Sequence, residues 1–464
     1  MLTYTFEKNS GISLYEQLYR YIKSDILSGR LTEGEKLPSK RTLATHLEIS
    51  VITVKNAYEQ LAAEGYIYGV EKKGYYVSRV ETPLQSGTAA PLPEAKKEPH
   101  YVLDLVTNSI SAEYFPFTVW SKAMRQTILE QDKGLLQPMP YNGALVLRRA
   151  IADNLQQFRG MTVDPEQIII GAGTEFLYYL LIQLLGRDRI YAVEDPGYSK
   201  IGRIYESNQV PLRRIGLDDA GLSAQELRKS GADVVHISPS HHYPTGIVMP
   251  IGRRQELLRW AGEQEGRYIL EDDYDSEFRF VGKPIPALQS IDTQEKVIYI
   301  NTFSKSFSST IRISYMVLPE HLMEKYHKEL SFYACTVSTF EQYTLASFIG
   351  EGHFEKHINR MRNFYRGQRD LLMDCIKKHP NYSQVQIAEE NSGLHFLLHV
   401  QTTLTDEQLV KKAAENGIHI SCLSQYYHDQ PESTLPHVIL INYSGLNSEK
   451  IPQAVEKLFD SLWE

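Results

Sequence analysis

KVIYINTFSKSFSSTIRISY, residues 296–315, joins two apolar runs through a polar turn that carries Lys305. The first run, and RYILEDDYD at 267–275, have the length and β-branched content of buried strands. Similar runs (QIIIGAG, RIYAVED, DVVHISP and RISYMVLP) alternate with helix-like segments such as YNGALVLRRAIADNLQQFRG. This alternation predicts a largely parallel α/β sheet that is covered on both faces.

Polar residues follow five of these runs, at the strand ends where α/β sheets form ligand sites. The residues that stand out there are Gly173, Thr174, Tyr198, Asp272, Tyr274 and Lys305. Taken singly, each has an ordinary structural explanation, such as a glycine turn into a helix or an exposed loop lysine. The loop SPSHHYPTG carries two histidines, but no cysteine or carboxylate nearby completes a metal ligand set, so we expect no metal.

Taken together, these residues meet the requirements of pyridoxal phosphate. That cofactor needs a lysine for its aldehyde, a carboxylate for its ring nitrogen, an aromatic side chain over the ring and donors for its phosphate. A desolvated lysine is a suitable nucleophile for an aldehyde. Residues 171–305 supply all of these groups at strand ends.

On these motifs, residues 100–464 resemble the fold-type-I aminotransferases. The resemblance implies that Lys305 is the Schiff-base lysine, that Asp272 faces the ring nitrogen and that Tyr274 contacts the ring hydroxyl. Tyr198 would stack on the ring. The phosphate would be held by Gly173, Thr174, Thr302 and Arg312. The planar fork of arginine suits phosphate oxygens.

The first 80 residues form a separate pattern. Leu14, Leu18, Ile22 and Ile26 repeat every four residues before Gly29 and predict a helix. Ser39 and Ser50 are suitable N-caps for two further helices, which a three-residue turn joins in helix-turn-helix spacing. YIYGV and YYV flank EKKG and predict a hairpin, or wing.

In such a unit the third helix enters the major groove and the other basic side chains contact phosphates. The candidate DNA contacts are Lys40, Arg41, Val51, Thr53, Lys55, Lys72 and Lys73. A generic three-helix domain with solvated charges is the alternative. Residues 11–78 resemble the winged helix-turn-helix of GntR-type regulators, although Val51 stands where that family often has arginine, so base readout there must differ.

The intervening VETPLQSGTAAPLPEAKKEPH has four prolines and no apolar period, so it predicts a flexible linker. The expected organisation is a DNA-binding head at 1–79, a linker at 80–100 and a body at 101–464 whose smaller α/β subdomain covers about 320–464. Three cysteines without metal spacing fit a reducing cytoplasm. The longest apolar stretch, Phe176 to Leu185, is too short to cross a bilayer. The net charge of −8 falls on the body, because the head is slightly basic.

A GntR-like head, a tether and an aminotransferase-like body in this order resemble the MocR/GabR group of bacterial transcription regulators. The resemblance implies a cytoplasmic regulator that binds double-stranded operator DNA as a head-to-tail, domain-swapped homodimer. It would sense a small amino compound through external imine formation on pyridoxal phosphate. An active aminotransferase with an accessory head, and a pyridoxal phosphate sensor controlling vitamin B6 synthesis, are the alternatives.

Three departures favour a regulator over an enzyme, with no catalytic residue assigned. Tyr243 replaces the asparagine that aminotransferases usually carry before PTG. Leu440 and Gly445 occupy the two positions where relatives place an arginine for the substrate carboxylate. The effector is therefore not expected to be γ-aminobutyrate. Lys200, Arg203 and Tyr243 are the candidate effector contacts.

Overall fold

The computed structural model describes residues 2–7, 11–80, 101–107, 114–282, 285–391, 393–428 and 435–463. The chain divides into two compact units, Met1–Glu98 and Pro99–Glu464, which we call the head and the body. Apart from Val80, the predicted linker at 80–100 lies outside the described residues. Its bounds therefore stay a prediction.

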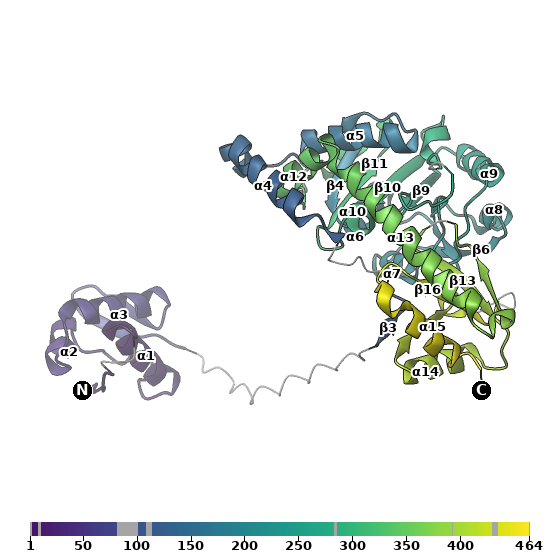
Figure 1. Ribbon diagram of the computed structural model, residues 1–464. Helices are drawn as coiled ribbons and strands as arrows, with labels where there is room; N and C mark the ends of the chain where they lie inside the picture. The colour runs from purple at the N-terminus through teal and green to yellow at the C-terminus, as the bar shows by residue number, and fades with distance from the viewer. Residues whose placement is uncertain are drawn as a thin grey trace. The chain divides into compact units, whose positions relative to one another are not determined.

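The head consists of three helices and a hairpin (Figure 1). Its elements are α1 (Leu14–Leu27), α2 (Lys40–His46), α3 (Val51–Ala63), β1 (Ile67–Val70) and β2 (Gly74–Val77). Both predicted caps are confirmed, because the Ser39 and Ser50 hydroxyls accept the backbone N–H of Thr42 at 3.1 Å and of Thr53 at 3.0 Å. These bonds satisfy amide donors that a helix start otherwise leaves unpaired.

One apolar cluster holds the head together. It joins the inner faces of all three helices to the hairpin, and its fully buried members include Leu18, Ile22, Leu43, Val54, Tyr58 and Leu61. The strands β1 and β2 pair antiparallel from Ile67 opposite Val77 to Val70 opposite Gly74. The predicted wing is therefore present, with Lys72 and Lys73 in the turn between the strands.

The body is built on an eight-stranded sheet with the order β4-β11-β10-β9-β8-β5-β6-β7. The strands are β4 (Ile168–Ala172), β5 (Tyr191–Asp195), β6 (Leu212–Asp218), β7 (Gly221–Leu222), β8 (Val234–Ile237), β9 (Tyr268–Asp273), β10 (Val297–Thr302) and β11 (Ile313–Val317). The central strands β10, β9, β8, β5 and β6 are mutually parallel, whereas β11 runs antiparallel to both of its neighbours. This confirms the prediction of a largely parallel sheet.

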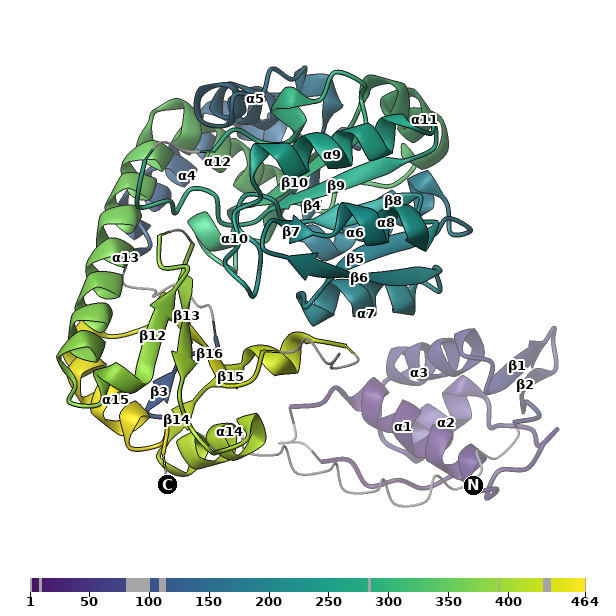
Figure 2. The same cartoon turned by 90° about the vertical axis from the view of Figure 1, so that its right-hand side faces the viewer.

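Helices cover both faces of this sheet (Figures 1 and 2). On one face, Ile298 and Ile300 of β10 join an apolar cluster with α6 (Thr174–Leu185), α7 (Ser199–Ser207) and α11 (Glu320–Leu330). On the other face, Tyr299 packs in a cluster with α5 (Leu145–Arg159) and α12 (Thr339–Gly350). Further helices are α4 (Phe117–Gln131), α8 (Ala224–Ser230), α9 (Ile251–Gly262) and the short α10 (Phe303–Ser306).

The smaller subdomain follows the long helix α13 (His353–Lys378), which leads away from the large sheet in Figure 2. It holds the antiparallel sheet β12-β13-β16-β15 and the parallel pair β14-β3. Its elements are β3 (Leu103–Asp104), β12 (Val385–Ala388), β13 (His395–Val400), α14 (Asp406–Glu415), β14 (Ile418–His419), β15 (Ser421–Cys422), β16 (Val438–Asn442) and α15 (Ile451–Phe459).

The predicted start of this subdomain near residue 320 stays a prediction. After that position, Leu322 and Tyr326 of α11 still pack with strands of the large sheet, and so does Leu345 of α12. Within the part of the chain that the structure describes, no helix is both long enough and apolar enough to cross a membrane.

Candidate functional site

The predicted site residues of the body gather because parallel strands bring their carboxyl ends to one edge. Asp272 near the end of β9 lies beside Ile300 of β10, and Thr302 ends β10. Thr302 in turn lies opposite Ser314 of β11, which lies opposite Gly171 of β4. The turns that follow β4, β9 and β10 therefore open at neighbouring positions.

Lys305 lies in the single turn of α10, directly after β10. Its side chain is partly buried, and burial lowers the pKa of its amine, although the charge of Asp275 opposes that change. A lowered pKa increases the fraction of neutral amine, which is the nucleophilic form. The position and environment of Lys305 both suit attack on an aldehyde.

Asp272 is buried, and only one of its two carboxylate oxygens has hydrogen-bond partners among the described residues. Its Oδ2 accepts the Tyr178 hydroxyl at 2.6 Å and lies 3.4 Å from His236 Nε2. Its Oδ1 is also buried, yet no hydrogen-bond partner reaches it within the described residues. Such a buried acceptor is costly unless a donor meets it. A protonated ring nitrogen is a donor of the required kind.

Gly173 and Arg312 form a tight corner at the start of α6. Gly173 caps that helix with φ +92°, and a Cβ built on it would lie 2.2 Å from Arg312 Nη2. A side chain at residue 173 would therefore push the guanidinium away. Thr174 is the first residue of α6, so backbone N–H groups and a guanidinium face the same corner. This combination suits a phosphate group.

Thr302 contributes to the neighbouring wall. Its hydroxyl accepts the Ser314 hydroxyl at 2.8 Å and donates to the Ser304 hydroxyl at 2.9 Å. These bonds connect β10, β11 and α10 beside Lys305. The structure thus brings Thr302, Lys305 and the Gly173–Arg312 corner to adjoining turns.

Glu175 was not predicted from the sequence and binds two cations at this corner. Its carboxylate accepts Arg312 Nη2 at 2.7 Å and also pairs with Lys200 Nζ. Hydrogen bonds from Lys200 and Arg312 help to lower the pKa of Glu175 to about 2, against the opposing effect of burial. Lys200, a candidate effector contact, is therefore paired with Glu175 at the candidate phosphate-binding corner.

Tyrosines line another side of the site. Tyr198 caps α7 and is 50% exposed, and its ring meets the Tyr243 ring edge-on at 5.8 Å. The Tyr243 hydroxyl is hydrogen-bonded to the Tyr426 hydroxyl at 2.9 Å. Tyr243 thus links the large sheet to the smaller subdomain, whereas Arg203 is exposed on α7. The role of Lys200, Arg203 and Tyr243 as effector contacts stays a prediction.

Tyr274 contacts a buried histidine. Its hydroxyl lies 3.1 Å from His241 Nδ1, and the same nitrogen lies 2.9 Å from Asp275 Oδ2. Burial raises the pKa of Tyr274 well above its ordinary value, so the phenol keeps its proton. Nearby, burial raises the pKa of Glu194 to about 8 and lowers the pKa of His242 to about 3.

These observations fit pyridoxal phosphate. The unpaired Asp272 Oδ1 awaits a donor, a Cβ at Gly173 would obstruct the guanidinium of Arg312, and Lys305 offers an amine of lowered pKa. The structure also shows the surroundings of the two positions where relatives place an arginine for the substrate carboxylate. Leu440 is buried in β16 within an apolar cluster, and Gly445 is exposed.

The candidate DNA contacts lie on α2, α3 and the wing of the head. Val51 is 46% exposed at the first turn of α3, Lys55 pairs with Glu59 at 3.7 Å, and Lys40 Nζ lies 5.0 Å from the centre of the Tyr75 ring. Arg41, Lys72 and Lys73 are exposed. The Thr53 hydroxyl is hydrogen-bonded to Ser50 at 2.8 Å, so it is held next to the helix cap.

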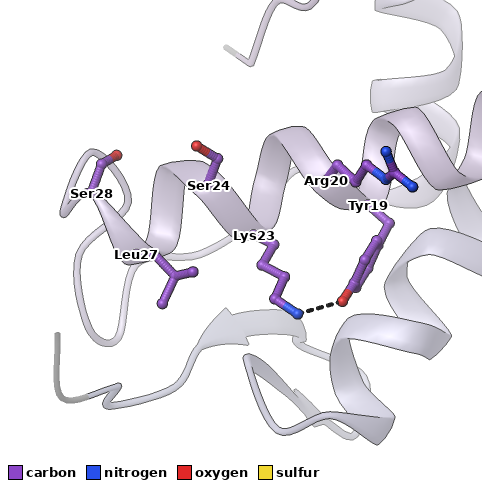
Figure 3. Close-up of a pocket in the computed structure, with 6 residues that line it drawn as sticks. All are labelled: Tyr19, Arg20, Lys23, Ser24, Leu27 and Ser28. Atoms are coloured by element: carbon purple, nitrogen blue, oxygen red, sulfur yellow. Dashed lines mark hydrogen bonds between the residues drawn. The ribbon is translucent and has the colours of Figure 1, made fainter. Parts of the chain in front are cut away.

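A separate pocket on the head lies along α1 (Figure 3). It is lined by Tyr19, Arg20, Lys23, Ser24, Leu27 and Ser28. Lys23 donates to the Tyr19 hydroxyl at 2.6 Å and pairs with Glu64 at 3.0 Å. None of the candidate DNA contacts lines this pocket.

The residues that sequence reasoning missed are mainly the partners of the predicted ones. They are Glu175, Tyr178, His236, His241 and Asp275. Three of these five residues, Glu175, His241 and Asp275, lie within the motifs GAGTEF, SPSHHYPTG and EDDYDSEF. Their contacts with the predicted residues form only when strands that are distant in the sequence lie side by side. Among the residues with assigned positions, no group of three His, Cys, Asp or Glu side chains is arranged to hold a metal ion.

Comparisons with known proteins agree with this architecture. Residues 14–77 match the family described as bacterial regulatory proteins, gntR family, and residues 102–458 match aminotransferase class I and II. The second match spans most of the chain.

Three relatives are similar along most of their length. The HTH-type transcriptional regulator YdeL of Bacillus subtilis is 38% identical over 98% of both chains. The pyridoxine biosynthesis transcriptional regulator PdxR of Corynebacterium glutamicum is 30% identical over 89% of both chains. The probable rhizopine catabolism regulatory protein MocR of Rhizobium meliloti is 28% identical over 97% of this chain and 94% of its own.

Among solved structures, the kynurenine aminotransferase of Pyrococcus horikoshii superposes with a TM-score of 0.69. The match covers 79% of this chain and 91% of that protein at 22% identity. At this identity the match shows the fold alone, which is that of an aminotransferase body.

Proposed function

We propose, on the premise that this chain belongs to the GntR family and within it to the MocR/GabR-type regulators with an aminotransferase class I and II body, that an amino compound bound in the body controls DNA binding by the head. The family membership makes the chain a DNA-binding transcription regulator and makes pyridoxal phosphate its cofactor. The nature of the effector and the control that it exerts are the proposed part.

The observation that carries the proposal is the buried, unpaired Oδ1 of Asp272 beside the strand that leads to Lys305. Bound pyridoxal phosphate supplies an aldehyde that condenses reversibly with an amine. Lys305 presents that amine, and Asp272 holds the proton on the ring nitrogen. Tyr274 would contact the ring hydroxyl, and Tyr198 would stack on the ring.

The phosphate is held at the corner of Gly173, Thr174, Thr302 and Arg312. Because Glu175 already pairs with Arg312 there, its carboxylate competes with the phosphate or reorients the guanidinium. Lys200 shares Glu175, so a change at this corner also reaches α7. Tyr243 and Arg203 are the remaining proposed effector contacts.

In the head, α3 is the recognition helix and Val51, Thr53 and Lys55 face base edges. Lys40, Arg41, Lys72 and Lys73 contact phosphates. Two heads in a head-to-tail homodimer would read two half-sites in the cytoplasm, where operator DNA lies. An effector that prefers one domain arrangement shifts the population of DNA-competent dimers. A coupling of about 1–3 kcal/mol, roughly 5- to 150-fold in affinity, is sufficient.

The two positions where relatives bind the substrate carboxylate, Leu440 and Gly445, favour a regulator that does not turn over substrate. The relatives are named regulators, and the apolar setting of Leu440 and the missing side chain at Gly445 leave no arginine there. Catalysis requires the reacting bond to be held in one orientation, and a carboxylate anchor normally helps to hold it. We therefore propose negligible transamination.

The test combines three measurements on the cofactor-loaded full chain. Candidate amines are added while the visible spectrum, the operator affinity and keto-acid formation are followed. The expected result is a spectral change and an altered operator affinity with no product. Many turnovers with an added keto acid would establish an enzyme instead. Lys305→Ala lacks the amine that an effector would displace, so its spectrum should already differ from that of the wild type before any effector is added.

A second candidate function is sensing of pyridoxal phosphate itself. It is favoured by the 30% identity to PdxR, which is named for pyridoxine biosynthesis. Under this alternative, loading the apoprotein with cofactor alone changes operator affinity, and no amine is required.

A further inference from the structure

His241 and Asp275 form a buried pair directly behind the proposed cofactor contacts. His241 follows β8 and Asp275 follows β9, and each side chain is only 2% exposed. His241 Nδ1 lies 2.9 Å from Asp275 Oδ2 and 3.1 Å from the Tyr274 hydroxyl. One nitrogen therefore faces two oxygens.

The chemistry of these groups fixes where the proton lies. An ionised carboxylate only accepts hydrogen bonds, so Nδ1 must carry a proton to bond to Asp275. The Tyr274 oxygen then meets an N–H and acts as an acceptor toward it. Since a hydroxyl has a single proton, the O–H of Tyr274 is left to donate elsewhere.

The ring of His241 is held in place from the smaller subdomain. Gly393 has φ +72°, and a Cβ there would lie 1.7 Å from His241 Cε1, so the ring fills the space that a side chain would need. The His395 ring lies 4.8 Å away, and His395 Nε2 is bonded to the Pro244 carbonyl at 3.1 Å. The ring of His241 has little room to turn.

Several other titratable or charged groups surround this pair and belong to any account of its pH dependence. Around His241 they are Asp275, Tyr274, His242, His395 and Glu389, with Arg159 and Arg279 lining the same small cavity and Lys305 interacting with Asp275.

We propose that His241, oriented by Asp275, is a positioning residue that fixes the Tyr274 hydroxyl as a hydrogen-bond donor toward the ring oxygen of the cofactor. This inference rests on the proposed function, because it assumes the cofactor beside Tyr274. A donor to that oxygen stabilises its negative charge and lowers the proton affinity of the adjoining group on Lys305. His241 thereby sets the pH at which the bound cofactor changes its absorbance.

Two variants of His241 separate positioning from simple structural support. The amide nitrogen of His241→Asn takes the place of Nδ1, so it still donates toward Asp275 and Tyr274. The longer side chain of His241→Gln places its amide near Nε2 instead. Both are polar and of similar size, so the pair is matched. His399→Leu, on the same strand as His395, is the control for loss of a histidine.

The measurement is a pH titration of the visible band of the cofactor-loaded full chain. His241→Gln is expected to raise the pH midpoint by about one pH unit, the size of a hydrogen bond to a charged group. His241→Asn should stay near the wild type, Tyr274→Phe should match His241→Gln, and the double variant should shift no further. Operator binding by each variant checks that the head is intact.

Each possible outcome bears either on this inference or on the proposed function that it rests on. An unchanged midpoint in folded His241→Gln would overturn the inference. A further shift when His241→Gln is added to Tyr274→Phe would also overturn it, because His241 would then act independently of Tyr274. If His241→Gln does not fold, Asp275→Asn removes the same orientation and must raise the midpoint. Absence of any visible band in the wild type would refute the proposed function instead.

Discussion

The head and the body present their functional side chains in opposite ways. In the head, Arg41 and Lys72 are exposed on a small core. In the body, Asp272 is buried and Tyr274 is bonded to a buried histidine. The head therefore displays charge on a scaffold, so single changes should act locally. In the body each role depends on a partner from another strand, so a single change should disturb several groups.

The largest expected effect tests the body. Lys305→Ala removes the amine placed directly after β10, so the visible band that depends on its bond to the cofactor should disappear. Operator binding without effector should persist, because the head is a separate compact unit. Absorbance spectroscopy, circular dichroism and a DNA-binding assay check this. Lys229→Ala, an exposed lysine on α8, is the control. Retained absorbance would contradict the site assignment.

A substitution that creates a cavity in the core of the head should impair DNA binding and leave the cofactor site intact. Leu43 is fully buried in the head core, so Leu43→Ala should destabilise the head by about 2–5 kcal/mol. Operator binding should fall while the cofactor spectrum stays unchanged. Denaturant unfolding and spectroscopy of the same sample measure both. Loss of cofactor binding together with DNA binding would show that the two units are not independent.

The pH dependence of stability should differ in sign between the two units. Burial raises the pKa of Glu194 in the body to about 8 from an ordinary 4.5, so folded protein keeps a proton that the unfolded chain releases. Its contribution is complete below about pH 4.5 and is lost as the pH rises toward 8. The hydrogen bond from Tyr19 lowers the pKa of Glu64 in the head to about 2, so its contribution is lost only as the pH falls through that value.

Glu194→Gln should therefore reduce the loss of stability of the body between pH 5 and pH 8, roughly the interval between the two pKa values. Thermal unfolding of the cofactor-loaded protein at a series of pH values measures it. Glu64→Gln is the matched change in the head and should leave this interval unaffected. An equal slope in wild type and Glu194→Gln would count against a protonated Glu194.

Phosphate contacts in the head should give a smaller and uniform effect. Arg41→Ala and Lys72→Ala should each weaken binding to every DNA sequence and reduce the salt slope of binding by about 1. Thr53 and Lys55 variants should alter sequence preference instead. Lys229→Ala should change neither property. Equal salt slopes in all variants would refute the contact assignment.

The smallest effect compares two helix caps. Ser50 caps α3 in the head and Thr405 caps α14 in the body, and each accepts the backbone N–H of the residue three positions on. Ser50→Ala and Thr405→Ala should each cost about 1 kcal/mol of the free energy of unfolding. Ser50→Ala alone should also weaken DNA binding, because it loosens the first turn of α3. Denaturation curves and DNA titrations distinguish the two.

Much of the head was predictable because its determinants are local. Ser39 and Ser50 were identified as caps from their place before a periodic run, and the apolar spacing of Val54, Tyr58 and Leu61 gave the buried face. Strands of the body were likewise recognisable as apolar runs. These features depend on residues within a few positions of one another.

The partners within the body site were not predictable in this way. His241 meets Asp275 across 34 residues, and Glu175 meets Arg312 across 137. The apolar face of α11 gives no indication of which sheet it covers, although its residues pack with the large sheet. Such contacts depend on the strand order, which the local pattern of α11 does not contain.

The two-residue strand β3 attaches the start of the body to the smaller subdomain. β3 pairs with β14, Leu105 N–H donates to the His419 carbonyl at 2.9 Å, and Asn442 N–H donates to the Leu105 carbonyl at 3.0 Å. The chain therefore enters the body through the smaller subdomain and not through the large sheet. Of the described residues that follow the head, the first to pair in the body are therefore those of β3, and their partners belong to the smaller subdomain.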